Sequence, residues 1–231
     1  MKGMEVLMEK LEYLKKYRKE IEIFSGINDQ IKSVIPNSWS DIFGTEDMQE
    51  RIRKVLNIWR ENVYAELTNT FLYLEQNIKT LDLISYNNKF FILYGIQMGT
   101  GEVDYFEGGN PLDCKENNLF IGMPEKLKRF YSSVHNGFYY FPSKLMGMVS
   151  IDRVTHFAES EWGILDDLEQ PLQINLETTY GFYNNAGGVY IAIDYQNCEN
   201  DNATIWYVDD EPEYNVNFWK EVDEWMNASF E

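Results

Sequence analysis

Apolar residues recur at helical spacing through the first third of the chain. Between residues 4 and 24, one stripe of leucine and isoleucine lies among charged residues, which predicts a single amphipathic helix that covers an apolar surface. The stripe consists of Leu7, Leu11, Leu14 and Ile21. Pro36 interrupts the pattern, and residues 39–44 predict a short helical turn that ends at Gly44.

A second, longer helix is predicted to begin near Thr45, where a capping hydroxyl precedes acidic residues. Its apolar positions keep helical spacing for about 35 residues, which is long for a globular protein and predicts a break near residues 68–70. The apolar face consists of Ile52, Val55, Leu56, Trp59, Val63, Leu67, Phe71, Leu74 and Ile78. We expect these side chains to form core and to bind no cofactor.

From Leu83 onward the apolar period changes to that of strands. Residues 90–94 and 103–106 flank the turn-forming residues 99–101, and together they predict a β-hairpin.

The stretch 108–118 is polar and contains glycine and proline, which predicts a junction in the chain. We divide the chain there into a helical N-terminal region with a β-hairpin, residues 1–110, and a C-terminal α+β domain, residues 111–231. The N-terminal region can also be part of the same domain.

Two short helices are expected after this junction. Pro124 followed by Glu125 is typical of a helix start, and the dipeptide 136–137 (Asn-Gly) predicts the end of that helix. Ser150 is expected to cap the second helix. The apolar face of this second helix contains Ile151, Val154 and Phe157.

Three strands and a closing helix complete the pattern. Residues 181–183, 189–194 and 203–208 predict strands, and the turn-forming run 197–202 makes the last two antiparallel neighbours. A helix capped by Asn215 or Asn217 is expected to cover them with Phe218, Val222 and Trp225. The predicted fold class is α+β, a mostly antiparallel sheet packed by helices, with a helical N-terminal extension.

The composition is that of a folded protein, because 44% of its 231 residues are hydrophobic and 16% are aromatic, although the formal net charge is −18. That charge is unevenly placed. Residues 1–60 carry eleven Lys or Arg and ten Asp or Glu, whereas residues 154–231 carry Lys220 alone against seventeen carboxylates. Acidity can serve solubility alone, but its one-sided placement favours a cationic partner.

The acidic C-terminal half excludes several partners and locations. Nucleic acid and anionic membranes both require Lys or Arg at the contact, so we expect neither as a direct partner. No apolar run reaches eighteen residues and the first residues lead into a charged stretch, so we expect a cytoplasmic protein. Cys114 and Cys198 lie far apart, outside any zinc-type spacing, and are expected to be free thiols.

Several segments of the C-terminal half carry a family resemblance. A proline-started helix at 122–131 runs into an Asn-Gly dipeptide, and a glycine-containing strand leads into a serine-capped helix at 145–154. A glycine-led strand ending in an acid at 187–194 and a closing helix at 218–225 follow. In this order the segments resemble the SUKH superfamily, over residues 119–231. That superfamily contains bacterial toxin-immunity proteins and fungal regulators of cell-wall synthesis.

The resemblance implies an α+β domain that acts by binding and not by catalysis. It implies as the usual partner a secreted polymorphic toxin, often a nuclease. It says nothing about the first 110 residues, which are longer than the usual lead-in to this domain.

Candidate catalytic and metal-binding groups are few. His135 and His156 have no Ser or Cys motif beside them, and we expect structural or surface roles for both. The acidic pairs 166–167 and 209–210 could supply general acid–base groups, but adjacent side chains tend to point apart. The oxygen-rich stretch 194–201 lacks the glycine turn and terminal Glu of a calcium loop. We therefore expect no catalysis, no metal and no cofactor.

A rim of carboxylates near aromatic residues remains, and this mixture suits an interface with a cationic protein. The expected partner-binding residues are Glu159, Glu161, Asp166, Asp167, Glu169, Asp194, Asp201, Trp206, Asp209, Asp210, Glu211 and Glu213, with Trp162 beside them. Core packing would also explain the two tryptophans.

The sequence therefore favours an immunity protein that binds and neutralises a basic protein toxin, such as a nuclease. A regulatory adaptor without a toxin partner is the alternative. The sequence leaves the oligomeric state open.

Overall fold

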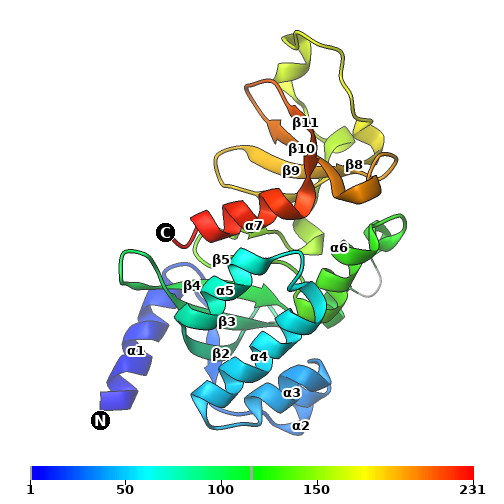
Figure 1. The fold of residues 1–231 in the computed structure, drawn as a ribbon. Helices are drawn as coiled ribbons and strands as arrows, with labels where there is room; N and C mark the ends of the chain where they lie inside the picture. The colour runs from blue at the N-terminus through cyan, green and yellow to red at the C-terminus, as the bar shows by residue number, and fades with distance from the viewer. Residues whose placement is uncertain (1, 115–116) are drawn as a thin grey trace.

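One antiparallel sheet runs through nearly the whole chain. The computed structural model describes residues 2–114 and 117–231, and within these residues eleven strands form a single sheet. Their order is β1-β2-β3-β4-β5-β6-β8-β9-β10-β11, with β7 beside β8 (Figure 1). The strands are β1 (Glu22–Phe24), β2 (Ile78–Tyr86), β3 (Lys89–Gln97), β4 (Val103–Gly109), β5 (Phe138–Tyr140), β6 (Leu145–Met148), β7 (Thr155–His156), β8 (Thr179–Asn184), β9 (Val189–Asp194), β10 (Asn202–Tyr207) and β11 (Glu213–Asn217). The predicted α+β class with a mostly antiparallel sheet is confirmed.

Helices pack on both faces of the sheet. The α-helices of the described residues are α1 (Lys2–Lys15), α2 (Asp29–Lys32), α3 (Asn37–Phe43), α4 (Met48–Val63), α5 (Thr68–Asn77), α6 (Glu125–Arg129) and α7 (Phe218–Ala228). One π-helical turn, Phe130–Val134, continues α6. Short 3₁₀ turns occupy Pro111–Cys114, Asn118–Phe120, Ile151–Arg153, Phe157–Glu159, Gly163–Asp166, Leu176–Thr178 and Glu199–Asp201.

The main core lies between α4, α5, α7 and one face of the sheet. Trp59 of α4 and Phe71 of α5 are buried there, and the Trp59 indole N–H donates to the hydroxyl of Tyr94 on β3 (3.2 Å). Helix α1 covers the opposite face of β2 and β3, where Leu14 packs in a second cluster with Leu93. The predicted helical N-terminal extension is therefore part of the layers that cover this sheet.

The long apolar pattern predicted from Thr45 forms two helices, α4 and α5, so the expected break is present. The break falls at residues 64–67, between α4 and α5, close to the predicted position. Asp47 caps α4 in place of Thr45, because its carboxylate accepts the backbone N–H of Glu50 (2.8 Å). The last apolar position of the predicted helix, Ile78, begins strand β2 instead.

Helix α1 is shorter than the predicted helix over residues 4–24. It ends at Lys15, and the chain then turns so that β1 pairs with β2 at the edge of the sheet. Leu7 is 46% exposed, so the predicted apolar stripe is not buried along its length. Backbone pairing with β2 supplies hydrogen bonds for residues 22–24 that a continued helix would have supplied internally.

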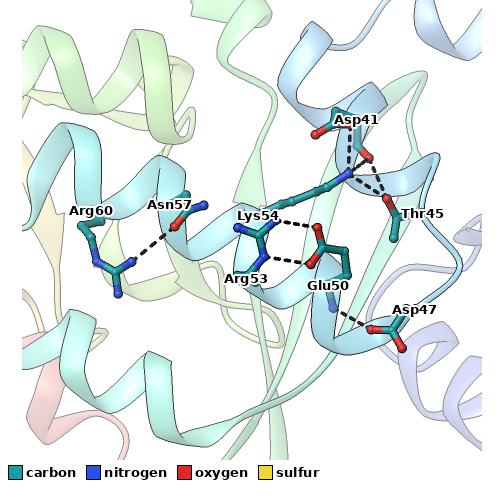
Figure 2. Close-up of polar contacts among 8 residues, drawn as sticks. All are labelled: Asp41, Thr45, Asp47, Glu50, Arg53, Lys54, Asn57 and Arg60. Atoms are coloured by element: carbon teal, nitrogen blue, oxygen red, sulfur yellow. Dashed lines mark hydrogen bonds and ion pairs between the residues drawn. The ribbon is translucent and has the colours of Figure 1, made fainter.

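The polar face of α4 pairs its charges within the N-terminal half (Figure 2). Lys54 donates to the carboxylate of Asp41 (2.9 Å) and to the hydroxyl of Thr45 (2.8 Å), which ties α4 to the end of α3. Such exposed pairs contribute little stability each. They show that Asp41 and Glu50 of this half have cationic neighbours.

The strands of the C-terminal half follow the prediction. Strands β9 and β10 are antiparallel neighbours, with Ile191 opposite Ile205. Helix α7 is capped by Asn217, whose side chain accepts from the Lys220 backbone N–H (3.0 Å), and it buries Val222 against the sheet. Trp225, which we expected in the core, is only partly buried. Its ring packs edge-on against the Tyr183 ring, with the ring centroids 5.6 Å apart.

The prediction of a helix after Ser150, with Ile151, Val154 and Phe157 on one face, is wrong. Residues 151–153 form one 3₁₀ turn, and Thr155 and His156 then pair with β8 as strand β7. Because the backbone of β7 is used in the sheet, Phe157 points into a separate cluster and not onto a shared helical face with Ile151.

The sheet continues across the junction proposed at residue 110. Strand β4, from the N-terminal part, pairs with β5 through Phe106 and Tyr140. The division into residues 1–110 and 111–231 stays a prediction. Among the described residues, no helix combines the length and the apolar character needed to cross a membrane.

Candidate functional site

A long segment between β7 and β8 covers the outer face of β9 and β10. This segment, residues 157–178, is called the strap here, and Figure 1 shows it in yellow at the end of the molecule away from α1. Phe157, the first residue of the strap, and Trp206 of β10, which lies beneath the strap, are fully buried in a third apolar cluster. The Trp162 indole N–H donates to the Phe157 carbonyl (2.8 Å), which fixes the start of the strap over Trp206.

The ends of the strap are held by His156. Its Nε2 donates to the Glu177 carbonyl (3.0 Å), and its Nδ1 lies 3.3 Å from Glu159 Oε1. The ring stacks on Tyr180 of β8, with centroids 4.7 Å apart. His156 thus has the surface role that the sequence suggested, and it also closes the base of the strap.

The turn between β10 and β11 lies against the strap. The backbone N–H of Glu169 donates to Glu211 Oε1 (2.6 Å), which joins the two acidic segments that the sequence placed apart. On the strand side, the Tyr207 hydroxyl donates to Glu213 Oε1 (2.6 Å), and this hydrogen bond is the main cause that raises the pKa of Tyr207 to about 12.

We call the resulting surface the acidic end. It consists of nine carboxylates: Glu159, Glu161, Asp166, Asp167, Glu169, Asp209, Asp210, Glu211 and Glu213. Eight are exposed and Glu211 is half-buried. Within the described chain, none of them forms an ion pair with Lys or Arg.

Three residues expected at the interface do not lie on this surface. Trp206 has no exposed area, because the strap covers it. Asp194 is buried and accepts from the Thr178 hydroxyl (2.6 Å) and from the Asn175 N–H (2.9 Å), so it anchors the end of the strap. Asp201 is engaged by Lys126 at 2.6 Å. The structure thus places Trp206 and Asp194 in buried, structural positions and Asp201 in an ion pair.

Tyr207 is a residue of this surface that sequence reasoning missed. It is half-buried and directly contacts Glu213 across the turn. Its place next to the buried Trp206 on a strand was the available signal, because successive strand residues face opposite sides.

Two further side chains that could take part in catalysis, His135 and Cys114, are buried in the core. His135 is fully buried among aromatic rings, with Nε2 2.6 Å from the Tyr94 hydroxyl, and burial lowers its pKa to about 3. Burial raises the pKa of the Cys114 thiol, which also lies in the core. In the part of the chain that the structure describes, no group of three or more His, Cys, Asp or Glu side chains could hold a metal ion.

An antiparallel sheet covered by helices defines an α+β domain, and its acidic end is exposed and without Lys or Arg partners among the described residues. The model of the SMI1/KNR4 family (SUKH-1) matches residues 111–228, which is half of the chain. The protein belongs to this SUKH family, whose members are in general non-catalytic immunity or regulatory proteins. Comparison with curated proteins and with solved structures gave no match.

Proposed function

We propose that this protein is an immunity protein that binds and neutralises a cationic protein toxin in the cytoplasm. A single observation supports this most, namely nine carboxylates that two segments bring to one end of the sheet, without Lys or Arg partners in the described chain. Membership of the SUKH family agrees with such a role, because the family includes toxin-immunity proteins.

The unpaired state of these carboxylates distinguishes them from Asp41 of α3 and Glu50 of α4. Asp41 and Glu50 have cationic neighbours within their own half (Figure 2), whereas the acidic end keeps its charge. Like charges held together destabilise the free protein, and a cationic partner would relieve that repulsion. A toxin surface that binds phosphate offers such cations, so we propose a nuclease as the simplest partner.

The acidic end should act mainly on the rate of association. Unpaired surface charges steer an oppositely charged partner over a range set by the Debye length, which is about 30 Å at 0.01 M salt and about 8 Å at 0.15 M. We therefore expect the association rate to fall steeply with salt. The same charge makes nucleic acid and anionic membranes unsuitable as direct partners.

The test compares two charge-reversed variants of equal net charge. The first carries Lys at Asp209, Asp210, Glu211 and Glu213. The matched control carries Lys at four N-terminal acids that are exposed and form no ion pair among the described residues, namely Glu12, Glu20, Glu22 and Glu46. Both reversals change the formal net charge from −18 to −10, because each substitution adds two units to the value for the native chain.

The partner to test is the toxin domain of a neighbouring gene, measured by stopped-flow association and by rescue of growth on co-expression. We expect the first variant to associate at least tenfold more slowly at low salt and to rescue poorly, while the control stays close to wild type. Equal association rates for the two variants would contradict the acidic end as the interface. A wild-type protein that binds no toxin domain and rescues no growth would favour the regulatory role instead.

A further inference from the structure

A polar cavity of about 130 Å³ lies where the N-terminal half meets the family domain. Tyr86 and Lys89, from the β2–β3 hairpin, form one side. Asn136, Lys144 and Arg153, from the SUKH domain, form the other side. The cavity is separate from the acidic end and is large enough for several waters or one small polyatomic ion.

Two cations of this cavity have no carboxylate partner in the described chain. Lys89 is engaged by Asp152 at 3.2 Å. The Lys144 ammonium instead lies 4.6 Å from the centre of the Tyr86 ring, and the Arg153 guanidinium donates only to the Lys144 carbonyl (2.7 Å). In a chain with 38 acids and 20 Lys or Arg, two unpaired cations on one cavity favour an anion supplied from outside.

Neutral groups of the lining can donate to the same anion. The side-chain oxygen of Asn136 accepts the Ile151 N–H (2.8 Å), so its amide N–H₂ group remains for a ligand. Asp113 is the second acid of the lining, and burial raises its pKa. Among the described lining groups without an ion pair, two cations, Lys144 and Arg153, stand against one acid, Asp113, so the net unpaired charge of the lining is positive.

A buried carboxyl group, that of Glu107, lies next to two residues that line the cavity, Tyr86 and Tyr139. Glu107 has no exposed area; its Oε1 accepts from the Tyr86 hydroxyl (2.7 Å), and its Oε2 has no partner in the described chain. Its cross-strand neighbour Tyr139 also lines the cavity. Burial raises the pKa of Glu107, against the nearby Lys144, whose charge lowers it.

The backbone at the rim is held in an uncommon conformation. Asn87 and Lys144 both line the cavity with positive φ, 50° and 59°, in the left-handed region. A lysine rarely adopts this left-handed backbone conformation. Residues held in uncommon backbone conformations tend to cluster at functional sites. The Lys144 ammonium of this turn lies over the Tyr86 ring, which also lines the cavity.

We propose that this cavity binds a small oxyanion, a phosphate or a carboxylate group, through Lys144, Arg153 and the Asn136 amide. Because Tyr86 and Lys89 come from the first 110 residues, the N-terminal half completes the site. The proposal does not depend on the acidic end or on a toxin partner.

The test titrates the full ¹⁵N-labelled chain with sodium phosphate and, separately, with sodium acetate, while sodium chloride keeps the ionic strength constant. We expect saturable shifts of the Asn136 side-chain amide signal with at least one of the anions. Lys144→Met and Arg153→Gln should each weaken this binding at least tenfold. Lys220→Met, at an exposed lysine of α7, is the control and should bind as wild type does.

Each outcome decides the proposal. A response to phosphate alone identifies a phosphoryl ligand, a response to acetate alone identifies a carboxylate, and both support the oxyanion site. No saturable shift with either anion, or wild-type affinity in both cavity variants, overturns it. Arg153 is exposed, so Arg153→Gln keeps the test valid if Lys144→Met does not fold.

Discussion

At the scale of single residues, the burial of His135 links the stability of the fold to pH. It packs against Trp39, Trp59 and Phe138, and its imidazole nitrogen lies 2.6 Å from the Tyr94 hydroxyl. Burial disfavours its charged form and lowers its pKa to about 3. Unfolding exposes the ring and returns the pKa to about 6.5.

This difference predicts a pH dependence with a definite sign. Below about pH 6.5 the unfolded chain binds a proton that the folded chain does not, so folding is progressively weakened as the pH falls toward about 3. Between pH 6 and pH 4 wild type should lose about 2 to 3 kcal/mol more than His135→Gln. Urea unfolding at both pH values measures this loss. His156→Gln is the control, and an equal loss in wild type and His135→Gln would contradict the prediction.

At the scale of secondary-structure elements, α7 stabilises the start of α5. The residue before α5, Leu67, offers no side-chain cap. Asp223 of α7 supplies it instead: its two carboxylate oxygens accept the backbone N–H groups of Asn69 (2.9 Å) and Thr70 (2.8 Å). A carboxylate at a helix N-terminus also interacts favourably with the helix dipole.

Removal of this cap should destabilise the whole fold. We expect Asp223→Ala to lower the free energy of unfolding by about 2 to 3 kcal/mol, because the buried N–H of Thr70 and the part-buried N–H of Asn69 lose a charged acceptor. Glu224→Ala, one position along on the exposed side of α7, should change it by less than about 0.5 kcal/mol. Equal values for the two variants in urea unfolding would show that the cap contributes nothing.

At the scale of the whole molecule, the charge is separated between the two halves. The N-terminal residues 1–60 are close to neutral, whereas residues 154–231 hold seventeen carboxylates and one lysine. Repulsion within the acidic end opposes the compact state, and salt screens it.

We therefore expect added salt to stabilise the protein. The free energy of unfolding should rise between about 0.01 M and 0.15 M sodium chloride. The rise should be smaller when Asp209, Asp210, Glu211 and Glu213 carry Lys than when the matched N-terminal acids do. Urea unfolding at the two salt concentrations measures this, and an equal rise in the two variants would place the repulsion elsewhere.

Much of the fold could be predicted from local pattern. The strand-forming residues 189–194 and 203–208, with the turn-forming run between them, predicted two antiparallel strands, and helical spacing predicted α4, α5 and α7. Where local pattern failed, backbone pairing had decided the structure: the spacing of Ile151 and Phe157 suits a helix, but β7 pairs with β8 between them.

The candidate site was predicted less completely. The carboxylates of the acidic end were identified by charge alone, since exposed acids need no tertiary partner to be recognised. The burial of Trp206 and Asp194 could not be predicted, because it depends on the strap, whose path over the sheet has no periodic signal. The oxyanion cavity gave no sequence signal, since its residues come from both halves of the chain.

The sequence by itself determined the fold class, the positions of most strands and helices, and the acidity of the C-terminal half. These follow from the period of apolar residues and from charge, which are local properties. Only the tertiary structure decided which acids are free, which tryptophan is covered, and which cations lack a partner. Those properties arise from contacts between residues distant in the sequence, such as Glu169 with Glu211 and Asp223 with Thr70, and no local pattern encodes them.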